Sequence, residues 1–329
     1  MLLPRDASGR LTALVFRTAG ASIVPIVATP ALAVQLDVYG LLNVTLQNSD
    51  EATEEQVELQ SNASRIGVKG SEPVSDGLEV IYQLEWGVDY DGASRDGDIY
   101  SRNQFVGLAG RFGTIKVGRH DTALKEAPGE FDLFEELEGD VGETFNGENR
   151  LGNYIGYSTP TFAHAFSATV NFFPDVDDPE ADDGDTDGIS ASLTYQTERF
   201  YAAIAFDHDI DRDDVNTTRL AGGYTRGPAQ LMLLYQHTAA RDADGDGFGV
   251  SLAWTIGDAT AKLQYLDADL WRTDPQPDPL DNLFEWSLSL GLDYALDEGT
   301  KLFGFYTTGE IGGTRESHRY AAIGLEHEF

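Results

Sequence analysis

From Val34 to Phe329 the chain consists of short segments in which hydrophobic and polar residues alternate, separated by turn residues. The segment Leu78–Trp86 is typical: its even positions are Leu, Val, Tyr, Leu and Trp, while positions 79, 83 and 85 are Glu, Gln and Glu. Successive side chains of a β-strand point to opposite faces, so the pattern predicts strands with one apolar face and one polar face. There are about sixteen such segments, and short turns alternate with longer acidic loops along them.

The alternation of short turns and long loops is typical of an up-and-down barrel, which has turns at one rim and loops at the other. Aromatic residues also occur near the ends of the apolar face, as in the girdle of a membrane barrel. They are Tyr90, Tyr157, Phe173, Tyr195, Trp254, Tyr294 and Tyr306. The pattern therefore predicts an all-β fold, a sixteen-stranded antiparallel transmembrane β-barrel over residues 34–329. A soluble β-sandwich is the alternative, because its strands alternate too.

One long stretch, Asp121–Asn149, breaks the alternation. It contains a short apolar patch, Phe131, Leu133, Phe134 and Leu137, surrounded by acidic residues. The acidic residues are Glu126, Glu130, Asp132, Glu135, Glu136, Glu138 and Asp140. Long irregular segments inside a regular domain are usually functional or disordered. We expect this stretch to fold inward as a constriction loop, with its apolar patch against the inner wall.

The first 33 residues are typical of a secretory signal peptide. Arg5, Arg10 and Arg17 precede the apolar stretch Ala19–Leu32, which ends in the small-residue motif Ala31-Leu32-Ala33. The pattern predicts cleavage after Ala33 and export of the mature chain; the alternative is a disordered cytosolic leader. No later stretch has the roughly 18 consecutive apolar residues of a transmembrane helix.

Composition narrows the possible functions. The net charge of −34 argues against nucleic-acid binding, since a phosphate backbone requires clustered Lys and Arg. Two origins of the acidity remain open, a high-salt habitat or loops that bind divalent cations. The absence of cysteine excludes disulfides, thiol catalysis and thiolate metal sites.

Motifs for metal binding or catalysis are weak. Asp183–Gly188 and Asp242–Gly247 both match the start of a calcium loop, but position twelve of such a loop is Glu, and here it is Thr194 or Ala253. We interpret both as solvated loops, with weak divalent binding as the alternative. The sequence has no Ser in a G-x-S-x-G context and no H-E-x-x-H. We therefore expect no enzymatic activity and no cofactor.

Several motifs together resemble the general-diffusion porins of Gram-negative outer membranes, which are trimeric sixteen-stranded channels. They are Ser64–Glu72 (SRIGVKGSE), Arg102–Leu108 (RNQFVGL), Gly113–Arg119 (GTIKVGR), Arg150–Pro160 (RLGNYIGYSTP) and the terminal Gly324–Phe329 (GLEHEF). The resemblance extends over essentially all of residues 34–329. It implies a homotrimer in the bacterial outer membrane, in contact with lipids and lipopolysaccharide, through which small hydrophilic solutes and ions pass.

In that family the loop after the fifth strand narrows the pore, and its acidic side chains face basic side chains of the wall. Pro128-Gly129-Glu130-Phe131 is similar to the Pro-Glu-Phe tip of that loop with one glycine inserted. The resemblance therefore implies that Glu130 and Asp132 line the constriction. Plausible substitutes on the same loop are Glu135, Glu136, Glu138 and Asp140.

For the basic wall, strand alternation can be used as well. Arg65, Lys69 and Lys116 lie opposite apolar neighbours and so should point into the lumen. Arg102 lies three residues before Phe105, which is assigned to the apolar face, so Arg102 should also point inward. Arg150 matches the arginine with which the family begins its sixth strand.

Opposed charges across a narrow, wet constriction create a transverse field and influence which ions pass. Because the predicted loop and the mouth of the barrel are strongly acidic, we expect a higher local cation concentration and a preference for cations. The basic wall acts in the opposite sense. A substrate-specific channel of the same architecture is the alternative, and an outer-membrane adhesin or barrel enzyme is a more distant one.

Overall fold

The computed structural model describes residues 35–51, 54–90, 99–176, 186–211, 214–240, 243–269, 284–312 and 314–329. The predicted signal peptide lies outside these residues, as does part of each of the two calcium-like segments. Among the described residues, no group of three or more His, Cys, Asp or Glu side chains is arranged to hold a metal ion. No helix in this part of the chain is long and apolar enough to cross a membrane.

The described residues are mostly strand. The first strands are β1 (Gln35–Glu51), β2 (Glu54–Ser61), β3 (Arg65–Ser75), β4 (Leu78–Val88), β5 (Ile99–Gly110), β6 (Gly113–Asp121), β7 (Arg150–Ser158), β8 (Phe166–Val176) and β9 (Thr186–Gln196). The later ones are β10 (Phe200–His208), β11 (Asn216–Arg226), β12 (Ala229–Ala240), β13 (Ala243–Ile256), β14 (Ala259–Ala268), β15 (Phe284–Ala295), β16 (Thr300–Ile311) and β17 (Ser317–Glu328). Two short helices, α1 (Ala123–Glu126) and η1 (Val141–Glu143), lie between β6 and β7.

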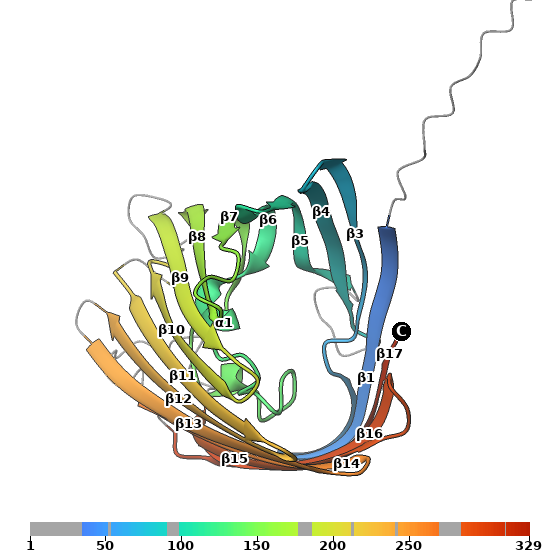
Figure 1. Ribbon diagram of the computed structural model, residues 1–329. Coiled ribbons are helices and arrows are strands. Elements are labelled where there is room, and N and C mark those ends of the chain that lie inside the picture. The colour runs from blue at the N-terminus through green and yellow to red at the C-terminus, as the bar shows by residue number, and fades with distance from the viewer. Residues whose placement is uncertain are drawn as a thin grey trace, which may run out of the picture. The chain divides into compact units, whose positions relative to one another are not determined.

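Antiparallel pairing joins consecutive strands into a ring (Figure 1). The ring closes where β1 pairs with β17, from Leu41 opposite Glu328 to Glu51 opposite His318. Two backbone hydrogen bonds between Gly40 and Phe329, of 2.9 and 3.1 Å, continue this pairing. The predicted closed barrel of sixteen antiparallel strands is confirmed. Closure pairs backbone groups between strands, as a β-structure requires in lipid.

The second strand of the barrel is broken in two. The first half of β1 pairs with β3, while its second half pairs with β2. Residues Asn62–Ser64 separate β2 from β3, and Ala63 there has a φ of 46°, in the left-handed region. The two pieces share one position in the ring, which is why seventeen strand segments form sixteen barrel strands.

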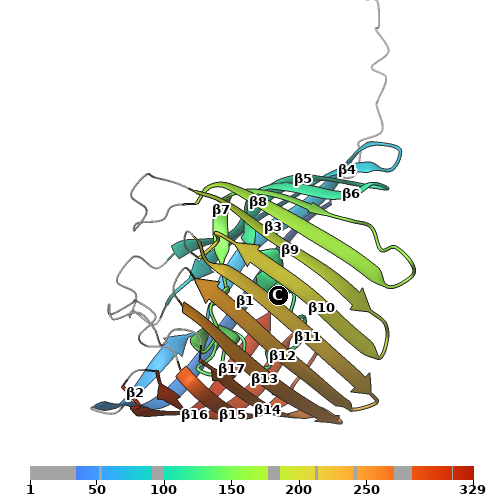
Figure 2. The same cartoon turned by 90° about the vertical axis from the view of Figure 1, so that its left-hand side faces the viewer.

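The two faces of the barrel differ as the alternation predicts. On β1, Leu36 and Val38 are 55% and 62% exposed on the outside, whereas Asn43, Thr45 and Gln47 are buried on the inside. Large apolar side chains cover the outer face of the other strands as well. The strands run obliquely across the barrel (Figure 2). An apolar outer surface on a closed, tilted sheet is the arrangement of a membrane barrel.

Two inferences from alternation are wrong. Phe173, assigned to the outer girdle, is 1% exposed and packs inside the barrel with Tyr154. Phe105 also points inward, where its ring lies 5.3 Å from that of His120. The register of β4 with β5 shifts between Leu84 and Trp86, so one extra residue of β5 falls between Arg102 and Phe105. Arg102 therefore does point inward, but because of a bulge and not for the reason given by the sequence argument.

Candidate functional site

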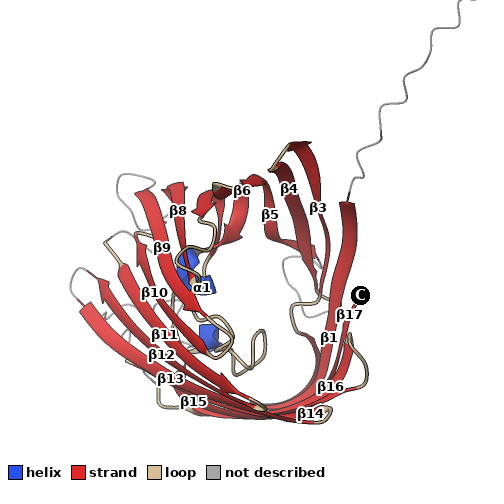
Figure 3. Cartoon of the chain, viewed as in Figure 1, coloured by secondary structure: helices blue, strands red, loops and turns tan. Residues whose placement is uncertain are grey.

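The segment Thr122–Asn149, called the insert below, connects β6 to β7 and lies inside the barrel (Figures 1 and 3). Its helices begin at capping side chains. Thr122 accepts a hydrogen bond from the Lys125 amide to start α1, and Asp140 accepts one from the Gly142 amide to start η1. Helices this short are not stable alone, so contacts with the wall must determine the insert's shape.

Part of the inner wall beneath the insert, called the seat below, is apolar. Its buried residues on β10, β11, β12 and β14 are Ala203, Ala205, Ala221, Met232, Leu234, Leu266 and Ala268. Phe131 of the insert packs among them, and Phe134 packs against Phe303 and Phe305 of β16. Both insert rings are fully buried. The expectation that the apolar patch packs against the inner wall is confirmed for these two residues.

Glycines in the wall make room for the rings. Three aromatic residues of the insert lie over glycines of β13 and β15: Phe131 over Gly249, Phe134 over Gly291 and Phe145 over Gly247. A Cβ atom at Gly249 would lie 2.6 Å from the ring of Phe131, and one at Gly291 would lie 2.9 Å from the ring of Phe134. These distances are shorter than any normal contact, so only glycine permits this depth of insertion.

Two of the acidic residues shape the insert itself. The Asp132 carboxylate accepts hydrogen bonds from the Phe134 amide (2.9 Å), the Val141 amide (2.8 Å) and the Gln264 amide group of β14 (3.1 Å). Asp140 accepts bonds from the backbone amides of Glu136 and Gly142. Their carboxylates thus satisfy backbone groups that no helix or sheet pairs.

Between the insert and the β2 side of the wall lies an opening of about 580 Å³. Its lining contains one lysine, Lys125, and nine carboxylates. The carboxylates are Asp121, Glu126, Asp132, Glu135, Glu136, Glu138, Asp140, Glu143 and Glu148. A second space of about 220 Å³ shares Asp132, Glu135 and Glu136 with it, and is lined in addition by Arg65, Lys262, Lys301, Glu326 and Glu328. The described lining is therefore strongly acidic, and most of its cations border the smaller space.

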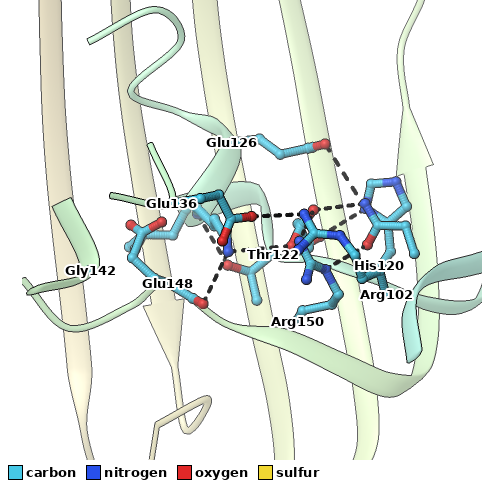
Figure 4. A network of polar contacts seen from close by, with 12 residues as sticks. Arg102, His120, Thr122, Glu126, Glu136, Gly142, Glu148 and Arg150 are labelled. Carbon is cyan, nitrogen blue, oxygen red and sulfur yellow. Dashed lines mark hydrogen bonds and ion pairs between the residues drawn. The ribbon is translucent and has the colours of Figure 1, made fainter. Parts of the chain in front are cut away.

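Arg102 makes a direct ion pair between the wall and the insert (Figure 4). Its guanidinium lies 2.9 Å from Glu85 on β4 and 2.9 Å from Glu136 on the insert. Glu85 also accepts a hydrogen bond of 2.8 Å from Tyr39 on β1. Arg102 is 5% exposed, so two carboxylates share one largely desolvated cation.

The other basic residues proposed for the wall lie elsewhere. Arg65 borders the smaller space. Lys69 Nζ is 4.8 Å from the ring centroid of Tyr39, and Lys116 Nζ is 2.9 Å from Nε2 of His120. Arg150, at the end of the insert, pairs with Asp121 at 2.9 Å. Of the five basic residues predicted for the wall, one, Arg102, thus contacts an acid of the insert.

The acids proposed for the constriction also divide into groups. Glu130 is exposed and accepts a hydrogen bond from Gln230 of β12, away from the lining of the opening. Glu138 accepts one from Gln47 of β1 at 2.7 Å. Glu135 is exposed and borders both spaces. Glu135 and Glu136, together with Asp132, are therefore the acids of the insert that border both spaces.

Sequence reasoning missed two basic residues of the barrel wall that line the smaller space. Lys262 of β14 lies 3.1 Å from Asp293, and Lys301 of β16 lies 2.8 Å from Glu326. Alternation could have identified Lys262 as inward-facing, because its two neighbours in the sequence are apolar and face outward. It was missed because basic residues were sought only within the motifs that carry the resemblance.

A third missed residue, Arg219 of β11, lies under the insert and is fully buried. It forms an ion pair with Glu148 of the insert. Alternation places Arg219 opposite Leu220, which is 41% exposed on the outer face, so its inward direction was predictable. Its contact with the insert was not, because that depends on how the insert folds.

Burial changes the acidity of the insert. Burial raises the pKa of Glu138 to about 7, although the hydrogen bond from Gln47 opposes the shift. Burial raises the pKa of Asp132 to about 6 against its three hydrogen bonds. Burial and the neighbouring Asp132 charge raise the pKa of Asp140 well above its usual value. Part of the insert's charge therefore depends on pH near neutrality.

Known proteins of similar sequence or structure agree with this architecture. The protein P.IB, a major outer membrane protein of Neisseria gonorrhoeae, is 25% identical over 93% of this chain and 96% of its own length. A Salmonella typhi OmpF structure in complex with daunomycin superimposes with a TM-score of 0.74, at 16% identity, over 89% of this chain and 97% of that one. An anion-selective porin from Comamonas acidovorans gives a TM-score of 0.70 at 19% identity, over 90% of this chain and 100% of that one. At these identities the two structures support the fold alone.

The family model described as Gram-negative porin matches residues 18–314, most of the chain. Its match agrees with the closed sixteen-stranded barrel. The chain therefore belongs to the Gram-negative porin family, as an outer-membrane pore for passive diffusion and not an enzyme.

Proposed function

We propose that this pore passes small hydrophilic solutes with a preference for cations over anions. The observation that carries the proposal is the charge of the lining. Around the larger space, nine carboxylates accompany one lysine. A surplus of one sign of charge in a narrow passage with low-dielectric walls raises the concentration of ions of the opposite sign.

The basic side chains neutralise only part of this surplus, because carboxylates outside the lining of the larger space also pair with them. Arg102 has Glu85 and Glu136 as partners. Lys262 pairs with Asp293, and Lys301 pairs with Glu326 at 2.8 Å and approaches Asp293 at 3.8 Å. By contrast, Glu135 is exposed at the boundary of both spaces. The net field at the boundary is therefore that of the remaining acids.

Reversal potentials of single channels in a potassium chloride gradient test the proposal. We expect cation preference in the natural protein and a weaker preference in Glu135→Gln, which removes a charge from the lining. Glu130→Gln is the matched control, because Glu130 is also exposed on the insert but bonds to Gln230 outside the lining. Anion preference in the natural protein, or equal effects of the two variants, would contradict the proposal.

The same proposal includes assembly and export. Porin relatives are generally trimeric, and we infer that the chain, after cleavage following Ala33, forms a homotrimer that contacts lipopolysaccharide and lipid. The apolar outer face supports the contact with lipid. A heat-sensitive trimer band on a denaturing gel, and sequencing of the mature N-terminus, test these two points. A monomer band before heating, or an N-terminus other than Val34, would contradict them.

General diffusion, rather than transport of one favoured solute, is the second part of the proposal. Liposome swelling with uncharged sugars of increasing size should slow smoothly as size increases, because a lining of charges provides no pocket for one sugar. One solute that enters much faster than others of its size would instead identify a substrate-specific channel.

A further inference from the structure

Arg219 is a fully buried cation at the middle of β11, on the wall that lies under the insert. Its guanidinium donates four hydrogen bonds: Nε to Gln236 Oε1 (2.8 Å), Nη1 to Leu124 O (3.3 Å) and to Glu148 Oε1, and Nη2 to Asn146 O (2.9 Å). Such a site requires a planar group with several fixed donors, which arginine provides and lysine does not.

Three of these acceptors belong to the insert, and they come from its two ends. Leu124 lies in α1, at the start of the insert, while Asn146 and Glu148 lie just before β7. A single side chain of the wall thus holds both ends of the insert together. Because the ends of a loop limit where its middle can go, this contact restricts the whole segment.

The neighbouring strand β12 strengthens the same contact. Gln236 Nε2 donates to Asn146 O at 3.1 Å and to Asn146 Oδ1 at 2.7 Å. Thr238 Oγ1 donates to Asn146 Oδ1 at 3.1 Å. Asn146 is therefore bound from β11 and β12 at once, by Arg219, Gln236 and Thr238, which are all buried.

Glu148 connects this network to the pore. Its carboxylate pairs with Arg219 below the insert, and the same residue lines the larger opening. Arg219 is not part of that lining. A change at Arg219 can therefore alter the opening through the position of the insert and through the charge of Glu148 that it leaves unpaired.

We propose that Arg219 is the positioning residue of the insert: by binding both ends of it, Arg219 keeps the opening in a single, steady conformation. It contributes little to the closure of the barrel, which depends on backbone pairing. The proposal assumes that the insert bounds the conducting path. It does not depend on whether the pore prefers cations.

Single-channel recording of Arg219→Met is the first test. We expect substates in place of one open level, several-fold more open-channel noise and closure at lower voltage, because both ends of the insert lose their hydrogen bonds to Arg219. Arg219→Lys keeps the positive charge but lacks the several donors that a guanidinium holds in one plane. We therefore expect its noise and voltage of closure to lie between those of Arg219→Met and the natural protein. Arg226→Met, an exposed cation at the end of the same strand, is the control and should behave like the natural protein.

A second variant and a second readout exclude simple misfolding. Glu148→Gln keeps the side chain's size and an acceptor, so the barrel should fold and show a milder form of the same noise. Because the chain has no cysteine, Glu135→Cys gives a single site for a spin label on the exposed tip of the insert. We expect the label to become more mobile when Arg219→Met is added.

The outcomes separate this proposal from the one on ion preference. A heat-modifiable, folded Arg219→Met protein with a single steady level and an immobile label would overturn the role of Arg219. A protein with no cation preference, but with noise that appears in Arg219→Met, would overturn the proposed ion preference alone.

Discussion

The inner wall of the barrel has two halves that differ in chemistry although both face inward. On the pore side, β1, β4 and β5 present Asn43, Gln47, Glu85 and Arg102. On the seat, the corresponding inward positions of β10 and β12 are occupied by residues such as Ala203 and Met232.

The comparison shows that alternation predicts whether a side chain points inward or outward, but not what surrounds an inward side chain. An inward side chain such as Arg102 meets charged partners on the pore side, whereas the inward side chains of the seat meet aromatic rings of the insert. The seat can be apolar because the insert covers it, and the insert can lie there because the seat is apolar. Each of the changes below alters one half and leaves the other intact.

The largest effect is expected from Phe131→Ala combined with Phe134→Ala. Phe131 is fully buried against the seat and Phe134 against β16, and removal of each ring should cost roughly 3–5 kcal/mol of docking free energy. We expect the insert to leave the seat and become sensitive to protease while the barrel stays folded. Limited proteolysis in detergent measures this. Phe112→Ala, at an exposed aromatic residue, is the control, and an insert that stays resistant in the double variant would contradict the role of the seat.

On the pore side, Arg102→Met removes the partner shared by Glu85 and Glu136. Removing one partner of a buried ion pair lowers the free energy of unfolding by up to roughly 3–5 kcal/mol. The loss should be smaller here because the Glu136 side chain is 30% exposed. We expect a lower unfolding temperature by calorimetry and a reversal potential shifted toward cations. Lys69→Met, at an exposed lysine of the same half, should shift both much less. Equal changes in unfolding temperature and reversal potential in the two variants would mean that the ion pairs of Arg102 have no special role.

A smaller change at the seat is Gly249→Ala. Its new Cβ would lie 2.6 Å from the Phe131 ring, and accommodation of a methyl group in a packed site costs roughly 1–3 kcal/mol. We expect proteolysis of the insert at lower protease concentration. Gly222→Ala is the matched control, since no atom lies within 4 Å of its Cβ position. Equal resistance of the two variants to protease would argue against a close fit between the Phe131 ring and Gly249.

The smallest effect is that of pH on the pore side. Because burial raises the pKa of Glu138 to about 7, this carboxyl is charged above that pH and neutral below it. Cation preference should therefore fall as pH decreases from about 8 to about 6, with Asp132 contributing at the lower end. Reversal potentials at several pH values measure this. Glu138→Gln should flatten the upper part of the curve, and an unchanged curve would rule out a contribution from Glu138.

Much of the fold was predictable because strand direction follows from a period of two. The alternation on β1 correctly separates Leu36 and Val38 outside from Thr45 and Gln47 inside. It fails at the bulge of β5, where an extra residue resets the period. A bulge has no reliable signature in one sequence, so an argument that counts residues across it can give the right answer only by chance.

The candidate site was less predictable, because the insert has no period. Its acids looked alike in the sequence, yet Asp132 and Asp140 bind backbone amides while Glu136 pairs with Arg102. The role of each acid depends on the backbone turns within the insert, for example at Glu136, whose φ of 62° is positive. Local sequence does not specify such turns when the wall supplies most of the contacts.

The pairing of β1 with β17 also has a consequence for the order of assembly. The hydrogen bond from Asn43 to Glu326 joins residues 283 positions apart, near the greatest separation that the chain allows. Contacts between distant residues form slowly, since the entropy of closing so long a loop opposes them. Until that last seam forms, the growing sheet has two open edges that can pair with another chain. The seam is therefore the step at which assembly competes with aggregation.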